Sequence, residues 1–194
     1  MKTKNSFYFL LFFTLIMISC SDDDVPEAEN DEEIITDVSL IFSPQGGGAP
    51  LVFKAVDPDG AGVADLQVEG EIALAVNTTY DLFIELENSI DGEDISEEVK
   101  EEGDEHQLFF SFTNDLFVNP TGAGNIGTSS GSVNYSDQDE NGLPIGLITT
   151  WRTEVVGQGN FRVLLKHQPD LKTSTSTSGI GSSDLDITWE IVIQ

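Results

Sequence analysis

The sequence predicts an all-β protein, an antiparallel immunoglobulin-like β-sandwich with one short crossover helix. Two observations lead to this fold class. From residue 34 onward apolar and polar residues alternate nearly throughout, as in strands whose successive side chains point to opposite faces of a sheet. Clusters of Gly, Pro, Asn and Asp interrupt the alternation at short intervals, which is typical of sandwiches. A jelly roll or a small barrel is the alternative architecture.

The strands follow in chain order from this alternation. It is clearest over residues 38–42, 51–56, 79–87 and 185–193, and it predicts further strands near 68–76, 106–113, 131–136, 145–154 and 160–167. Trp151 and Trp189 fall within these patterns. We therefore expect both indoles to pack in the core rather than to form a sugar-stacking surface.

Residues 94–103 break the strand pattern and predict the helix. Asp94 and Glu97 have the spacing of an N-terminal cap, and Gly103 is a typical residue at a helix end. Ile95 and Val99 lie four residues apart, so both can face the sandwich. We expect a short helix that crosses from one sheet to the other.

The N-terminal segment has the features of a secretion signal. Two lysines precede an apolar run over residues 7–18, which as a helix would rise about 18 Å, too short for a hydrocarbon core of about 30 Å. The only cysteine, Cys20, follows at once. These features predict a signal peptide over residues 1–19, an acidic tether over 20–33 and a single domain over 34–194.

The residues around Cys20 resemble a bacterial lipoprotein signal, although Met17 departs from the leucine usual three positions earlier. The resemblance implies that Cys20 is acylated and becomes the mature N-terminus. The acidic run at 21–24 resembles the export signal of surface-exposed lipoproteins of the Bacteroidota. It implies a lipid anchor in the outer membrane with the domain facing the cell surface.

The domain as a whole resembles small β-sandwich lipoproteins of the Bacteroidota, mainly over residues 95–110 and 165–170. Such proteins are often paired with TonB-dependent receptors, so the resemblance implies a receptor of that class as partner. A formal net charge of −27, from 35 acidic and 8 basic residues, argues against nucleic acid, because phosphate binding depends on Lys and Arg.

The only two histidines, His106 and His167, each lie at the end of a predicted strand on its inward face. Glu102 and Glu105 lie just before the first of them. Imidazole and carboxylate together suit zinc, copper or iron, which predicts a transition-metal site if the two rings meet in space. The alternative is a pair of rim histidines hydrogen-bonded to loop backbone.

A second candidate is a calcium-like loop that begins at Asp137. Asp137, Asp139 and Asn141 offer oxygen at the first, third and fifth positions, and Gly142 stands at the sixth. The twelfth position, where a bidentate Glu normally closes the loop, is Ile148. A hairpin turn built on Asn-Gly is therefore the alternative.

No nucleophile elbow, phosphate-binding glycine loop or other catalytic set appears, so we expect no enzyme. The sequence predicts an outer-membrane-anchored ligand-binding or receptor-accessory module, with a metal or a metal complex as the specific ligand. The alternative is a structural or adhesive envelope protein without a small-molecule ligand.

Overall fold

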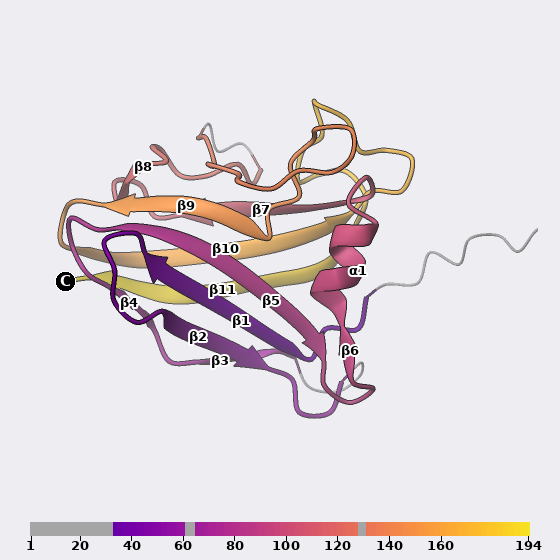
Figure 1. Cartoon of the computed structure of the whole chain (residues 1–194), viewed down its shortest axis with the longest axis horizontal. Helices are drawn as coiled ribbons and strands as arrows, with labels where there is room; N and C mark the ends of the chain where they lie inside the picture. Colours follow the sequence, from indigo (N-terminus) through magenta and orange to yellow (C-terminus); the bar gives the residue numbers. More distant parts are fainter. Residues whose placement is uncertain (1–32, 61–64, 128–130) are drawn as a thin grey trace, which may run out of the picture.

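The computed structural model describes residues 33–60, 65–127 and 131–194 (Figure 1). The predicted signal peptide, Cys20 and all but the last residue of the predicted tether lie outside these ranges, so lipidation stays a prediction. Among the described residues, no helix has both the length and the apolar character that a membrane crossing requires.

The described strands form two sheets, and the predicted all-β sandwich with one helix is confirmed. The first sheet has the order β3 (Gln67–Glu69), β2 (Leu51–Val56), β1 (Asp37–Pro44), β5 (Thr79–Asn88), β9 (Ile148–Thr153) and β8 (Phe117–Asn119), and β6 (Glu93–Asp94) also pairs with β5. The second sheet has the order β4 (Ile72–Leu74), β11 (Ser182–Ile193), β10 (Gly157–His167) and β7 (His106–Phe112). All pairs are antiparallel except β4 with β11, which run parallel.

The core lies between the two sheets and is built from the inward side chains of the alternating strands. β5 and β11 show strict alternation of buried and exposed residues along most of their length. Trp151 and Trp189 are completely buried, as predicted. Trp151 packs edge-on against Phe161, with ring centroids 5.0 Å apart, so aromatic contacts join strands of both sheets.

Two predicted strands differ from the structure. The segment near 68–76 is divided at Gly70, which has φ of 80° and turns the chain from β3 in the first sheet to β4 in the second. The strand predicted at 131–136 is wrong. Within its described residues only Tyr135 forms an isolated bridge, with Thr149, and the Asn134 side chain takes the Thr150 carbonyl that a regular ladder would use.

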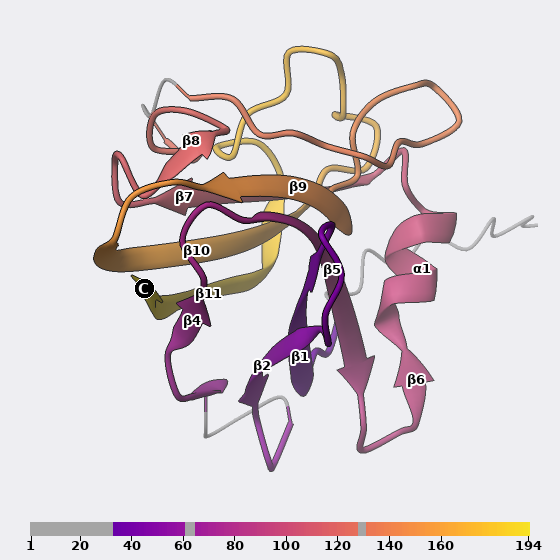
Figure 2. The same ribbon diagram turned by 60° about the vertical axis from the view of Figure 1, so that its left-hand side comes forward.

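The helix α1 (Ile95–Glu101) connects β6 in the first sheet with β7 in the second, as the crossover prediction requires. The Asp94 carboxylate accepts a hydrogen bond from the Glu97 amide at 3.2 Å and caps the first turn. Ile95 and Val99 are buried against the core. Figure 2 shows α1 at one end of the sandwich, directly after the short β6. Its C-terminal end leads into the candidate site.

Candidate metal centre

Antiparallel pairing of β7 and β10 brings the two histidines together. His106 is the first residue of β7, His167 is the last of β10, and the two are direct cross-strand partners. Side chains of such partners share a face of the sheet. The rings stack with centroids 4.5 Å apart and planes 6° from parallel. His106 is fully buried and His167 is 5% exposed, so the two histidines meet in the protein interior, which is the condition that a shared metal site sets.

A tight turn after α1 fixes the position of His106. The carbonyl of Glu102, the residue that ends the helix, accepts hydrogen bonds from the amides of Glu105 at 2.9 Å and His106 at 3.1 Å. The Glu105 carbonyl accepts in turn from the Gln168 amide at 2.6 Å. The turn is therefore joined directly to the end of β10, where His167 lies.

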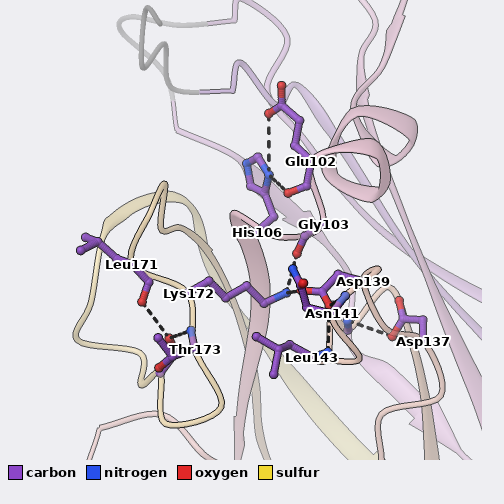
Figure 3. Close-up of polar contacts among 12 residues, drawn as sticks. Glu102, Gly103, His106, Asp137, Asp139, Asn141, Leu143, Leu171, Lys172 and Thr173 are labelled. Atoms are coloured by element: carbon purple, nitrogen blue, oxygen red, sulfur yellow. Dashed lines mark hydrogen bonds and ion pairs between the residues drawn. The ribbon is translucent and has the colours of Figure 1, made fainter.

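His106 is held in the neutral state. Burial and, to a smaller extent, the neighbouring His167 lower its pKa to about 4, although the hydrogen bond with the Glu102 carbonyl opposes the shift. The Nδ1 atom lies 3.2 Å from the Glu102 carbonyl and 4.0 Å from the carboxylate of the same residue (Figure 3). Near neutral pH the ring therefore carries one nitrogen lone pair, which a metal ligand requires.

The other nitrogen of His106, Nε2, lies 3.7 Å from a carboxylate oxygen of Asp184, and both side chains are fully buried. Asp184 occupies a β-bulge, since Leu165 pairs with Leu185 but Lys166 pairs with Ser183. A bulge re-aims a side chain that regular alternation would place differently. Sequence reasoning missed Asp184, because an acidic residue before an alternating strand carries no signal of a bulge.

His167 has its own carboxylate. Its Nε2 lies 3.2 Å from the Glu105 carboxylate, and its Nδ1 is buried without a hydrogen-bond partner among the described residues. A neutral ring donates Nε2–H to Glu105 and keeps its lone pair on Nδ1. Metal-binding histidines commonly have a carboxylate behind them in this way. Glu105, predicted as a metal ligand, is therefore placed to accept a hydrogen bond from His167.

Glu102, His106 and His167 each offer one ligand atom, and these atoms all lie within 4.8 Å of one another. Three protein ligands of this kind suit a transition metal and leave one position open. The near-parallel stacking of the two imidazole rings restricts how they can bind one metal ion. Nitrogen lone pairs lie in the ring planes, so one imidazole must tilt before both can reach a single ion at about 2.0–2.1 Å.

Further acidic groups surround the histidines. Burial raises the pKa of Glu33 to about 7, assisted by a hydrogen bond with Glu98 and by the charges of Glu98, Glu102 and Asp184. Glu33 is the last residue of the predicted tether, and this contact places it beside α1. The negative potential that keeps a proton on Glu33 also attracts cations to this end of the sandwich.

The predicted calcium-like loop forms a hairpin whose acids already have partners (Figure 3). One Asp139 oxygen accepts from the amides of Asn141 at 2.9 Å and Leu143 at 2.8 Å, and the other lies 3.0 Å from the Lys172 ammonium. Asp137 accepts from the amides of Gly146 at 2.9 Å and Ile148 at 3.2 Å.

A protein cation therefore stands beside Asp139, where a calcium ion would have to bind. Although burial opposes the shift, the Leu143 amide and Lys172 lower the pKa of Asp139 and keep it ionised. The hairpin-turn alternative explains the bonds that Asp139 accepts from the Asn141 and Leu143 amides. Nothing in the sequence pointed to Lys172 as the partner, because it lies in a Ser/Thr-rich loop more than thirty residues away.

No protein-family model matches this chain, and neither a curated protein nor a solved structure is significantly similar to it. The functional conclusion therefore rests on the geometry of the site and on the sequence around Cys20.

Proposed function

We propose that the protein is a lipid-anchored module of the outer-membrane surface that binds a transition-metal ion, or a complex of one. His106, His167 and Glu102 are the ligands. The observation that carries this proposal is the cross-strand pair of buried imidazoles with a carboxylate oxygen within 4.8 Å of a nitrogen of each. A buried pair of imidazoles suits zinc, copper or iron better than calcium, which prefers oxygen.

The surrounding carboxylates support a cation as the ligand. Glu105 is placed to accept Nε2–H of His167, and Asp184 lies on the Nε2 side of His106. In the bound state His167 would present Nδ1, its nitrogen without a hydrogen-bond partner among the described residues, and would have the Glu105 carboxylate behind Nε2. Such outer carboxylates orient the ring and raise its basicity.

The cellular placement rests on the N-terminal residues. The leader, Cys20 and the acidic run after it support an outer-membrane lipid anchor facing the cell surface. The resemblance to Bacteroidota lipoproteins supports a TonB-dependent receptor as the partner to which the ligand is presented. The role is binding and presentation rather than catalysis.

The test is metal titration of residues 20–194 carrying Cys20→Ser, which retain every described residue and both sheets. Zinc, copper or haem is added and the melting temperature is followed. A bound ligand raises stability, by about 2.7 kcal/mol at a hundredfold excess over Kd. We expect His167→Asn to abolish the rise and Glu190→Gln, which removes an exposed acid on β11, to preserve it. An unchanged melting temperature with all three ligands contradicts the proposal.

The second candidate is a structural or adhesive envelope protein. The nearly parallel stacking of the rings favours it, because two neutral histidines can pack in this way without any ion. It predicts that neither imidazole changes its NMR signals when the metals are added. Metal binding instead shifts the signals of both rings, since at least one of them must tilt.

A further inference from the structure

The outer face of the first sheet carries a row of apolar side chains, formed by Val52, Ile41, Phe83 and Ile148. The strand register places Ile41 opposite both Val52 and Phe83, and Phe83 opposite Ile148. The apolar row therefore crosses β2, β1, β5 and β9 in one line. Val52 is 50% exposed and Phe83 is 38% exposed, while the two isoleucines are half-buried.

The apolar row is unusual because it occupies the face that the alternation leaves to solvent. The inward residues of the same strands, such as Leu40, Leu82 and Ile84, already fill the core. Burying a large apolar side chain is worth about 1.5–3 kcal/mol relative to leaving it exposed. A contiguous exposed row of this kind marks an interaction site more often than a single exposed residue does.

The charges beside the apolar row indicate which partner fits. On β5 the exposed face continues on either side of Phe83 with Asp81 and Glu85, and then with Glu87, whereas on β2 the exposed Lys54 follows Val52 on the same face. Glu87 lies directly opposite Asp37 on β1, which places like charges side by side. Such pairs destabilise a sheet unless a cation lies near them. Among the described residues, Glu85 and Glu87 form no ion pair with a basic side chain.

Spacing indicates the shape of that partner. Neighbouring strands lie about 4.7–4.9 Å apart, so the members of the apolar row repeat at that interval. On a helix, residues three and four apart lie about 5–6 Å from each other on one face. An apolar helix face can therefore follow the row from strand to strand, with basic residues on its flanks above Asp81 and Glu85.

We propose that this face binds a basic amphipathic helix of a partner protein, with its apolar side on Val52, Ile41 and Phe83 and its Lys or Arg residues on the flanking carboxylates. A second copy of this chain fits poorly, because its own acidic face would meet the same carboxylates. The proposal is independent of the metal site, which lies at the ends of β7 and β10.

The test uses a synthetic fluorescent helical peptide with leucines on one face and lysines on its flanks. It is titrated into residues 20–194 carrying Cys20→Ser, and binding is followed by anisotropy. A scrambled peptide of the same composition, with its leucines spread around the helix, controls for attraction to a protein of net charge −27. We expect the amphipathic peptide to bind about tenfold more tightly than the scrambled one.

Two pairs of variants locate the binding face. Phe83→Ser lowers affinity for the amphipathic peptide about tenfold, whereas Val156→Ser, at an exposed valine between β9 and β10, leaves it unchanged. Val52→Ser serves as the second variant if Phe83→Ser unfolds. Replacing Glu85 and Glu87 by Gln weakens binding more than replacing the exposed Glu154 and Glu190, and added salt removes that difference.

Equal binding of the two peptides overturns the proposal, as does an equal effect of Phe83→Ser and Val156→Ser. Sedimentation of the protein without a peptide tests whether a second copy binds this face. A dimer of the unmodified protein that dissociates on Phe83→Ser identifies a second copy as the occupant, and it likewise overturns the proposal.

Discussion

Two neighbouring clusters of titratable side chains at one end of the sandwich differ in how their carboxylates are compensated. In the hairpin, Asp139 faces Lys172, and a buried carboxylate has a protein cation 3.0 Å away. At the histidine pair, carboxylates of Glu102, Glu105 and Asp184 face two imidazoles, of which His106 is neutral near pH 7. The first cluster supplies its own cation, whereas the second offers mainly acceptors. The first cluster is therefore structural, whereas the second suits an external cation.

Both clusters meet at the turn after α1. Lys172 donates to the Gly103 carbonyl, and Glu102 is the preceding residue (Figure 3). The lysine thus joins the Ser/Thr-rich loop, the hairpin and the turn that carries His106. Substitutions in the structural cluster should therefore destabilise this whole end of the sandwich. Substitutions of the histidines should instead change mainly the pH dependence of stability and the proposed metal affinity.

The largest expected effect is the loss of stability when the ion pair of the structural cluster is broken. Lys172→Met leaves the Asp139 carboxylate buried without its cation, and both side chains of the pair are at most 1% exposed. Loss of one partner of such a pair costs about 3–5 kcal/mol in the free energy of unfolding. Urea denaturation measures this cost. Adding Asp139→Asn should recover much of the loss, and a double variant as unstable as the single one would contradict the role of the pair.

The next effect is the pH dependence set by His106. Its pKa is about 4 in the folded protein and about 6.5 when unfolded, so the unfolded state binds the proton more tightly. As pH falls from 6.5 toward 4, the free energy of unfolding should decrease, by about 3 kcal/mol in total from this group. Urea denaturation at several pH values should show that His106→Asn lacks this decrease. An unchanged pH profile in the variant would show that His106 does not set it.

A smaller effect is expected on metal affinity, and it should differ between Glu102, the proposed ligand, and Glu105, which is proposed to orient His167. Glu102→Gln removes a proposed metal ligand, whereas Glu105→Gln removes the acceptor behind His167. Loss of an outer partner typically lowers metal affinity about 10–100-fold, and loss of a ligand should lower it more. Titration calorimetry with zinc measures both constants. Equal affinities for the two variants and the unmodified protein would remove these carboxylates from the site.

The smallest effect concerns Glu33. Its pKa is raised to about 7 by burial and by Glu98, so the folded protein keeps a proton that the unfolded chain loses above about 4.5. Its contribution to stability is therefore present at low pH and is lost as pH rises through 7, opposite in direction to that of His106. Glu33→Gln should remove this loss in urea denaturation across pH 5–8. The exposed Glu154→Gln should leave it in place.

Much of the fold could be predicted because alternation is a local property. The inward residues of β5 and β11, the two buried tryptophans and the capped helix from Ile95 to Val99 all follow from neighbours in the chain. The strand predicted at 131–136, which the structure does not form, shows where local alternation is insufficient. Its composition allows a strand, but the Asn134 side chain bonds to the Thr150 carbonyl of β9 and so disrupts a regular ladder.

The sequence by itself determined the alternating strands, the acidic composition and the position of each histidine at a strand end. Only the tertiary structure decided that His106 and His167 are cross-strand partners, that a bulge brings Asp184 to the first ring, and that Lys172 belongs to Asp139. The physical reason is that register between distant strands depends on the packing of whole sheets. A period of two fixes which face a side chain takes, but it leaves open which residue lies opposite.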